Sequence, residues 1–448
     1  MSELGYARWL MGSSLAFHIV FAAIGVAMPL LMAIAEWRWL RTRDPVDLAL
    51  ARAWAKGTAI FFAVGAVSGT VISFELGLLW PRFMGFSGGI IGLPFGLEGF
   101  AFFTEAIFLG IYLYGRDRIP PRVHLFAGVV VAVSGALSAF FVTLANAWMN
   151  SPAGFRLDAH GRPVDIDPIA AMFPPGWGTE VVHVLLSCYL ATGFAVASIH
   201  AALLRRYPDS VFHRRALGIA LAVGGVAAVL QPVSGDLSAR SVAGRQPAKL
   251  AALEGQFETA RGAPLRIGGI PDPEARETRF AVEIPRALSL LAFHDPDAEV
   301  RGLNEFPRDE WPPVLWVHLC FQAMVGIGTM LMALSLAGAA LAWRARGVPR
   351  QRWFLGAVAL AGPLGFVALE AGWMVTELGR QPWAVYGVLR TADSVTPVRN
   401  LAVPFWAFTA IYLVLTVMVA VLLWRQVAKT VPGREAKPAG AAPEPGPP

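Results

Sequence analysis

The stretch SSLAFHIVFAAIGVAMPLLMAIA, residues 13–35, decides the fold class of this chain. Its only ionisable side chain is His18. A helix rises about 1.5 Å per residue, so about 20 apolar residues cross the roughly 30 Å hydrocarbon core of a bilayer. The residues before it lack the charged segment of a cleaved signal peptide. We therefore expect residues 13–35 to form a membrane-spanning helix.

Eight further apolar stretches of similar length follow, at residues 55–76, 94–114, 124–147, 180–204, 216–233, 314–343, 354–377 and 403–424. The composition agrees with this count, because 56% of the residues are hydrophobic, only 15% are charged, and the mean hydropathy is +0.54. About a quarter of the residues are charged in a soluble domain. The sequence predicts an all-α, polytopic transmembrane helix bundle of nine spans.

The basic residues indicate the orientation of these spans. Twenty of the 37 Lys and Arg residues lie in alternate connections and in the tail, whereas seven lie in the short segments on the opposite side. Cytoplasmic loops carry the excess of Lys and Arg. The distribution therefore predicts an external N-terminus and a cytoplasmic C-terminus. It also accounts for the net charge of +6 without a nucleic-acid partner.

The longest connection is polar and rich in Pro and Gly, and a loop of this length in a compact protein is usually functional. The predicted organisation is spans one to six within 1–233, an external loop at 234–313, spans seven to nine within 314–431, and a disordered cytoplasmic tail at 432–448. The two cysteines, Cys188 and Cys320, lie in apolar stretches. They indicate neither a disulfide framework nor an iron–sulfur cluster.

Ligand-type side chains inside the spans are the first candidates for function, since an ionisable group there costs about 3 kcal/mol. His18, His183, Met324 and Glu377 come from four different spans, and all four fall in the outer half of the bilayer by the predicted topology. His, Met and carboxylate groups can ligate heme iron. The alternatives are hydrogen bonds between helices for each His and core filling for Met324.

Two further carboxyl groups, Glu98 and Glu105, are seven residues apart and therefore share one helix face. A desolvated carboxyl group without a partner tends to stay neutral. The pair is a candidate proton relay, and the alternative is a pair of structural hydrogen-bond donors.

Several motifs in these regions resemble those of the cytochrome bd quinol oxidase subunit I family. They occur in the family's order as GLEGFAFFTEA (96–106), ANAWMNSP (145–152), KLAALEGQFET (249–259), GIPDPE (269–274), FQAMVGIG (321–328), EAGW (370–373) and GRQPW (379–383). The resemblance covers nearly the whole chain. The chain lacks the insertion that long-loop members carry before the seventh span, so it is similar to the short-loop type.

The resemblance implies roles for the heme ligands. By position, His183 and Met324 match the axial pair of a low-spin heme b, and His18 and Glu377 match the ligands of two high-spin hemes. One of these is a high-spin heme b, and the other is either heme d or a second high-spin heme b. Arg380 and Trp383 fall in the heme-site signature, where Arg can neutralise propionates and Trp can stack.

The same resemblance implies a quinol site at Lys249 and Glu254 in the loop and an intramembrane acidic pair at Glu98 and Glu105, with Ser138 beside it. Without the resemblance, the loop residues would read as a solvated helix face. One position departs from the family, because Gln322 stands where Arg is frequent two residues before the Met ligand. We expect a lower heme potential or a different partner at that position.

The function implied is that of the heme-bearing subunit of a bd-type terminal oxidase in the bacterial cytoplasmic (inner) membrane. It would oxidise ubiquinol or menaquinol, reduce oxygen to water, and generate a proton gradient without pumping. The resemblance also implies a second homologous membrane subunit, and it allows a small single-span subunit. The alternatives are a heme b anchor of a quinone-linked dehydrogenase and a secondary transporter.

Overall fold

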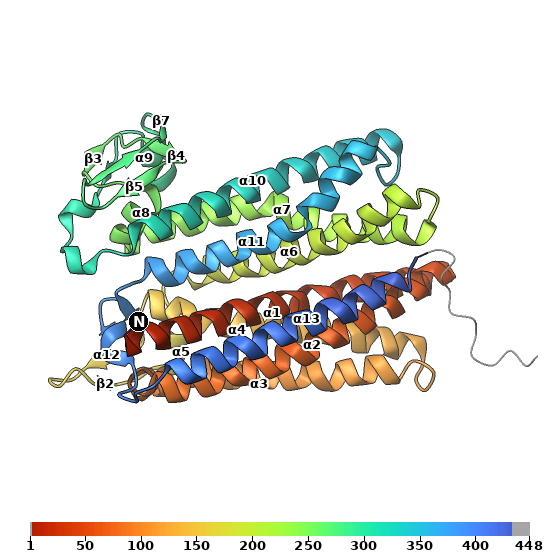
Figure 1. Ribbon diagram of the computed structural model, residues 1–448, viewed down its shortest axis with the longest axis horizontal. Coiled ribbons are helices and arrows are strands. Elements are labelled where there is room, and N and C mark those ends of the chain that lie inside the picture. The colour runs from red at the N-terminus through yellow and green to blue at the C-terminus, as the bar shows by residue number, and fades with distance from the viewer. Residues whose placement is uncertain (1, 432–448) are drawn as a thin grey trace, which may run out of the picture.

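The computed structural model describes residues 2–431, which are mainly helical (Figure 1). Nine helices in this range are long and apolar enough to cross a membrane. They are α1 (Glu3–Thr42), α2 (Pro45–Leu79), α3 (Pro81–Tyr114), α4 (Pro121–Asn150), α6 (Trp177–Arg206), α7 (Val211–Arg245), α10 (Val314–Ala345), α11 (Arg352–Gly379) and α13 (Ala402–Ala428). The predicted all-α fold of nine spans is confirmed for the described residues. The predicted tail, 432–448, lies outside them.

The helices extend past the predicted apolar stretches because capping residues, and not the hydrocarbon boundary, decide where they begin and end. Ser2 accepts a hydrogen bond from the Gly5 amide at the start of α1, at 3.1 Å. Arg43 ends α1 with a left-handed φ of 57°. Asp44 then caps α2 through the Val46 amide at 2.9 Å, and Pro45 occupies the first turn, where its missing N–H costs nothing.

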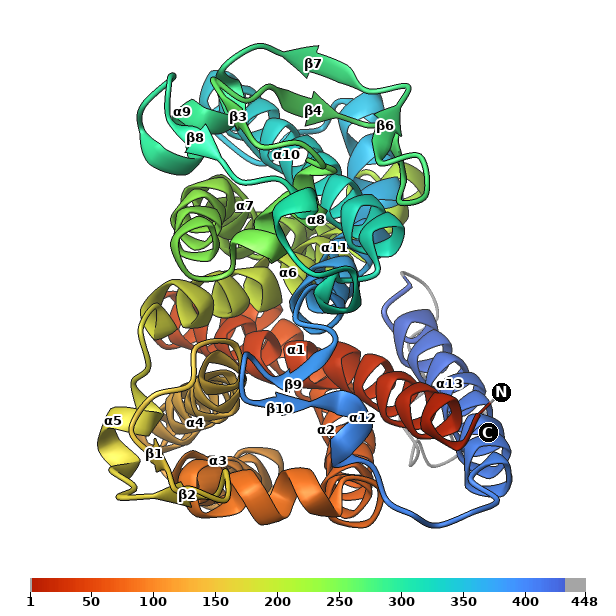
Figure 2. The ribbon, with the colours of Figure 1, turned by 90° about the vertical axis from the view of Figure 1, so that its left-hand side faces the viewer.

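The membrane helices form two bundles (Figures 1 and 2). The first bundle consists of α1, α2, α3 and α4, and the second bundle consists of α6, α7, α10 and α11. Helix α1 lies between them, since it packs against α2 and α4 on one side and against α6 on the other. Small residues allow close contact between helices in the second bundle. A Cβ added to Gly193 of α6 would lie 2.5 Å from the Cα of Gly224 in α7, so both helices require Gly there.

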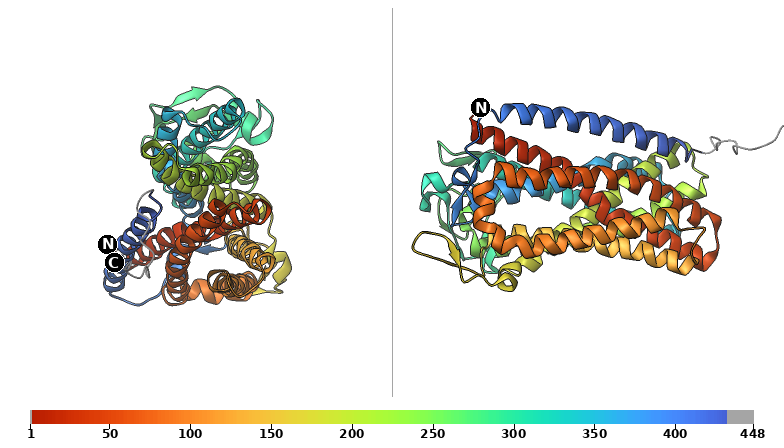
Figure 3. Two further views of the ribbon diagram at one scale, coloured as in Figure 1. Left: turned by 90° about the vertical axis from the view of Figure 1, so that its right-hand side faces the viewer. Right: turned by 90° about the horizontal axis from the view of Figure 1, so that it is seen from below.

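Helix α13 stands at the side of the first bundle, against α1 and α2 (Figure 3). Only two of its residues, Tyr412 and Val419, are buried. The Tyr412 hydroxyl donates to Ser14 Oγ at 2.9 Å, and Ser14 donates to Glu75 of α2 at 2.8 Å. At the same end of the helices, the Glu3 carboxylate accepts hydrogen bonds from backbone amides just before α13. These two amides belong to Asn400 and Leu401. The first and last membrane helices of the described chain are therefore joined directly.

The connections between membrane helices contain short elements. The α4–α6 connection holds β1 (Arg156–Leu157), β2 (Pro163–Val164) and α5 (Pro168–Met172), and the α11–α13 connection holds β9 (Trp383–Val385), β10 (Leu389–Arg390) and α12 (Thr391–Ser394). The α7–α10 connection, called the loop segment below, holds α8 (Pro247–Glu254), β3 (Ala260–Arg261), β4 (Leu265–Ile267), β5 (Ile270–Asp272), β6 (Glu277–Arg279), β7 (Val282–Ile284), α9 (Ala287–Phe293), β8 (Glu299–Val300) and the 3-10 turns Leu303–Glu305 and Arg308–Glu310.

The loop segment is an ordered unit that covers one end of the second bundle (Figure 2). Its strands pair as antiparallel ribbons, β3 with β8, β4 with β7, and β5 with β6. Its core is apolar, with Leu250, Ala263, Leu288 and Val300 buried together. Helix α7 continues to Arg245, so the first part of the predicted loop, 234–245, is helical.

Candidate functional site

His18 lies in the first bundle, where α2 holds its ring. The His18 Nδ1 atom is 2.9 Å from Ser68 Oγ, and the Ser68 hydroxyl also donates to the carbonyl of Val64 at 2.9 Å. A Cβ added to Gly69 would lie 3.0 Å from His18 Cε1, so glycine makes room for the ring. A histidine whose Nδ1 is engaged presents Nε2 to a metal.

Glu377, near the end of α11, is held by one residue of α4 and by the residue that follows α11. Its Oε1 accepts a hydrogen bond from Asn146 Nδ2 of α4 at 2.6 Å. Its Oε2 forms an ion pair with Arg380. Arg380 is only 2% exposed, and its Nε and Nη1 atoms have no hydrogen-bond partner among the described residues. A buried guanidinium with two unused donors fits an anionic group such as a heme propionate.

His183 and Met324 belong to the second bundle, on α6 and α10. The His183 Nδ1 atom is 2.9 Å from Ser234 Oγ of α7. Met324 packs against α11, where a Cβ added to Gly372 would lie 2.9 Å from Met324 Sδ. Because α6, α7, α10 and α11 pack together, the structure places both predicted ligands of one heme in one bundle.

A polar neighbour of His183, Gln231 of α7, was missed by the sequence reasoning. Its Nε2 atom lies 3.2 Å from His183 Nε2 and 3.2 Å from the His183 carbonyl oxygen. The sequence did contain an indication of this contact. Gln231 lies in an apolar span, and a buried side-chain amide needs a hydrogen-bond partner just as an ionisable group does.

Glu98 and Glu105 lie on one face of α3, as predicted from their spacing. Ser138 of α4 donates to Glu98 Oε1 at 3.1 Å. Glu105 is buried against α4, where a Cβ added to Gly135 would lie 3.4 Å from both carboxylate oxygens. A hydroxyl and two carboxyl groups therefore share the interface between α3 and α4.

The same face of α3 continues seven residues further to a buried polar cluster that the sequence reasoning also missed. The ring of Tyr112 lies 4.3 Å from the ring of His124, centroid to centroid. His124 Nδ1 is 2.7 Å from Glu36 Oε1, and Arg116 lies 3.5 Å from the same carboxylate. The repeat of seven from Glu98 through Glu105 to Tyr112 was the available signal.

Lys249 of α8 is buried, not part of a solvated helix face. It is only 5% exposed, and its Nζ donates to Asn150 Oδ1 at 3.2 Å and to the Thr376 carbonyl at 3.3 Å. Its stem crosses Gly379, where an added Cβ would lie 2.8 Å from Lys249 Cε. Burial lowers the pKa of Lys249 to about 8, and the negative charge of Glu180 opposes this shift.

Glu254 closes the same helix and is 4% exposed. Burial raises the pKa of Glu254 to about 8, opposed by the positive charge of Arg266. Its Oε2 atom has no hydrogen-bond partner among the described residues. A carboxyl group whose pKa lies near the working pH suits proton exchange with a bound substrate.

Two residues of α10 fasten the loop segment to the second bundle. His318 contacts the Leu253 carbonyl through Nδ1 at 2.8 Å and the Gly268 carbonyl through Nε2 at 3.0 Å. Gln322 donates to the Arg266 carbonyl and accepts from the Gly268 amide, both at 3.0 Å. The Gln that replaces the family's Arg therefore binds loop backbone.

Trp383 lies in β9, beyond the end of α11. The Arg390 guanidinium lies over the Trp383 ring, 5.1 Å from the ring centroid. The backbone amide of Trp383 donates to the Arg380 carbonyl at 3.0 Å. The described residues contain no group of three or more His, Cys, Asp or Glu arranged to hold a metal ion. The candidate heme ligands His18, His183, Met324 and Glu377 therefore belong to no such group.

Comparison with known proteins gives consistent matches over almost the full length. The family model described as cytochrome bd terminal oxidase subunit I matches residues 6–431. A Bacillus subtilis (strain 168) protein described as a cytochrome bd menaquinol oxidase subunit I is 41% identical over 94% of this chain and 96% of its own. A second protein of that strain, cytochrome bd ubiquinol oxidase subunit 1, is 30% identical over 96% of this chain and 94% of its own.

A solved structure gives the same result. The bd oxidase from Geobacillus thermodenitrificans contains a chain that superposes with a TM-score of 0.89 at 42% sequence identity. The match covers 95% of this chain and 98% of that one.

Proposed function

Since the chain belongs to the cytochrome bd terminal oxidase subunit I family, we propose how its residues divide the work of that subunit. The chain is a subunit of a bd-type terminal oxidase and a multi-pass protein of the cytoplasmic membrane. It acts as a quinol oxidase together with a second subunit. Family membership excludes the transporter and the dehydrogenase anchor. We keep the predicted topology, with an external N-terminus and a cytoplasmic C-terminus.

Quinol is oxidised at the interface between α8 and α11, and the burial of Lys249 and Glu254 is the observation that supports this most directly. Glu254 in its ionised form accepts a proton from a quinol hydroxyl. Lys249 in its charged form donates a hydrogen bond to the quinone oxygen. Both pKa values lie near 8, so the two required forms coexist close to that pH.

The heme-binding residues fit the groups that the family implies. His183 and Met324 would hold a low-spin heme b, and His18 and Glu377 would each hold one high-spin heme. One of these is heme b, and the other is heme d or a second heme b, which pigment extraction distinguishes. The hemes would supply one-electron transfer and the open iron position that oxygen reduction needs.

This chain's own residues prepare these sites. Ser68 and Ser234 fix the rings of His18 and His183 through Nδ1. Arg380 compensates the charge of Glu377 and offers its two unused donors to a propionate.

Protons for water formation reach the oxygen site along α3. The route begins at the polar cluster of Glu36, His124 and Tyr112 and continues through Glu105 and Glu98, with Ser138 beside Glu98. By the predicted topology this cluster lies at the cytoplasmic end. Quinol releases its protons on the outer side, so charge separation arises from proton uptake alone. We propose an electrogenic enzyme that moves about one charge per electron without a pump.

The partners follow from the relatives. The names of the two Bacillus subtilis relatives include menaquinol and ubiquinol, so either quinol is a candidate substrate. The homologous second subunit completes the complex, and a small single-span subunit is a candidate third member.

Oxygen uptake by the purified complex tests this function. We expect quinol to drive oxygen consumption and carbon monoxide to shift the reduced spectrum. Heme without a carbon monoxide shift, together with no oxygen uptake, would contradict an oxygen-reducing site in this chain.

A further inference from the structure

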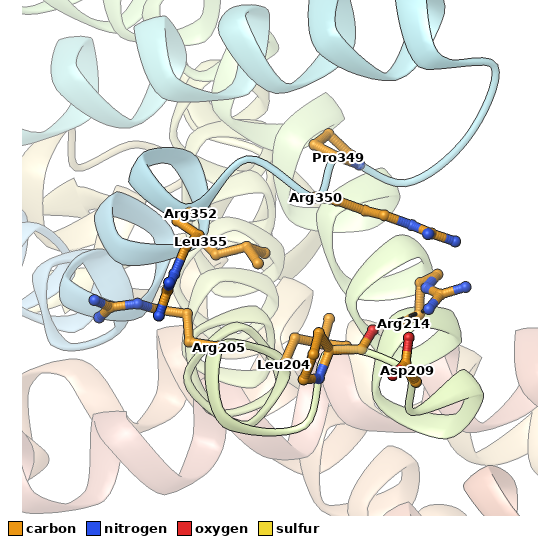
Figure 4. Close-up of a pocket in the computed structure, with 9 residues that line it drawn as sticks. Leu204, Arg205, Asp209, Arg214, Pro349, Arg350, Arg352 and Leu355 are labelled. Carbon is orange, nitrogen blue, oxygen red and sulfur yellow. Dashed lines mark hydrogen bonds between the residues drawn. The ribbon is translucent and has the colours of Figure 1, made fainter.

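A cavity of about 290 Å³ lies at the end of the second bundle opposite the loop segment. It opens between the connection from α6 to α7 and the connection from α10 to α11 (Figure 4). We call it the arginine pocket, because four arginines line it, namely Arg205, Arg214, Arg350 and Arg352. None of the residues assigned above to quinol, heme or protons lines it.

The arginines of the pocket lack carboxylate partners. Among the described residues none of the four lies within 4.0 Å of an Asp or Glu oxygen, and Arg214 donates only to the Pro208 carbonyl, at 3.0 Å. Asp209 also lines the pocket, which leaves it with a formal charge of +3. The neighbouring Arg215 shows the contrast, since it pairs with Asp44 at 2.5 Å and with Asp47 at 3.1 Å.

The arrangement of the side chains favours a bound anion. In the view of Figure 4, Arg205 and Arg352 lie at one end of the pocket, and Arg214 and Arg350 lie at the other. Three of the four arginines are exposed and water screens their mutual repulsion, yet an anion that enters the pocket meets guanidinium groups without a carboxylate partner. The planar fork of Arg matches two oxygens of a phosphate group. The positive-inside rule explains why arginines occur at this end of the helices, but not why four that line one cavity lack a carboxylate partner.

The rest of the lining indicates where the phosphate group comes from. Leu204 and Leu355 lie in the terminal turns of α6 and α11, and Pro208 and Pro349 lie in the adjoining connections. These side chains give the pocket apolar walls at the depth where a membrane helix leaves the hydrocarbon core. Basic pockets between helices at this depth suit lipid head groups.

We propose that the arginine pocket binds the phosphate group of an anionic phospholipid from the leaflet at this end of the helices. Arg205 and Arg352, at one end of the pocket, hold the phosphate oxygens, and Arg214 and Arg350, at the other end, add positive charge. The apolar side chains contact the glycerol backbone and the first part of the acyl chains.

Lipid retention by the purified two-subunit complex tests the proposal. The complex is titrated with phosphatidylglycerol and, separately, with phosphatidylcholine, and native mass spectrometry counts the bound lipids. We expect R205Q/R352Q to retain phosphatidylglycerol about tenfold more weakly. The matched control is R206Q/R346Q, which removes the same charge at the same end of the helices but lies outside the pocket lining. Its retention should equal that of the unaltered complex.

Each other outcome has a defined meaning. An equal loss in both double variants would show a diffuse charge effect and overturn the proposal, as would equal retention of the two lipids. Displacement of phosphatidylglycerol by low concentrations of inorganic phosphate would identify a free-phosphate site instead and would also overturn it. If R205Q/R352Q does not assemble, the single substitution R350Q provides the same comparison, with a smaller expected loss.

Discussion

The side chain of Lys249 lies across the backbone of Gly379, where an added Cβ would lie 2.8 Å from Lys249 Cε. This contact joins the loop segment to the end of α11, two residues after Glu377 and immediately before Arg380. The residues proposed for quinol and for a high-spin heme therefore share one structural support.

Gly379→Ala should weaken quinol binding, because the new methyl group displaces the lysine stem. Overpacking of this kind costs about 1–3 kcal/mol, so we expect KM for quinol to rise about tenfold. Steady-state oxygen uptake at varied quinol concentration measures this. Gly57→Ala is the control, since no atom lies within 4 Å of its added Cβ. An unchanged KM in Gly379→Ala would show that the position of Lys249 does not matter for quinol.

Glu254→Gln should reduce quinol-driven turnover by about 10²-fold, because the amide cannot accept the quinol proton. Oxygen reduction with an artificial donor that feeds the hemes directly should persist. Lys249→Ala should show the same split between donors. Equal failure with both donors would show that α8 has only a structural role.

The pH profile of quinol oxidation follows from the same two groups. Burial raises the pKa of Glu254 to about 8, so the rate should rise as the pH increases towards 8 and the carboxyl ionises. Burial lowers the pKa of Lys249 to about 8, so the rate should fall at higher pH as the ammonium loses its proton. We expect a bell-shaped profile centred near 8, measured with saturating oxygen. In Glu254→Gln the rising limb should disappear while the falling limb remains.

Met324→Leu should convert the low-spin heme to a high-spin form or lose it, because leucine offers no sulfur ligand. Leucine is close to methionine in volume, so the packing against Gly372 should survive. The low-spin band in the reduced spectrum is the readout, and the high-spin bands should remain. A normal low-spin band would refute the assignment of Met324 as a ligand.

Glu105→Ala should slow proton delivery by about 10²-fold, while quinol still reduces the low-spin heme. Enzyme in sealed vesicles with a voltage-sensitive dye measures both oxygen uptake and membrane potential. His124→Phe, at the proposed start of the route, should reproduce the defect. Rapid oxygen uptake by the unaltered enzyme without a membrane potential would place proton uptake on the outer side and contradict the route.

The fold could be predicted from the sequence because an apolar stretch of bilayer length has one stable conformation in lipid, whatever its neighbours. The grouping of helices into two bundles could not, because it depends on contacts such as Gly193 against Gly224, which no hydropathy pattern records. The burial of Lys249 could not be predicted from the sequence either. Helix α8 is short and carries charges, and its contacts with α7, α10 and α11 remove it from water.

The contact between α1 and α13 also sets an order of events during synthesis. Glu3 caps backbone at Asn400 and Leu401, and Ser14 receives its hydrogen bond from Tyr412. A ribosome that adds about 5–20 residues per second needs roughly 20–80 s to travel between these positions. During that interval the first helix already lies in the membrane without its last neighbour. The first bundle, with His18 inside it, therefore gains its contact with α13 only after all the other described membrane helices have been synthesised.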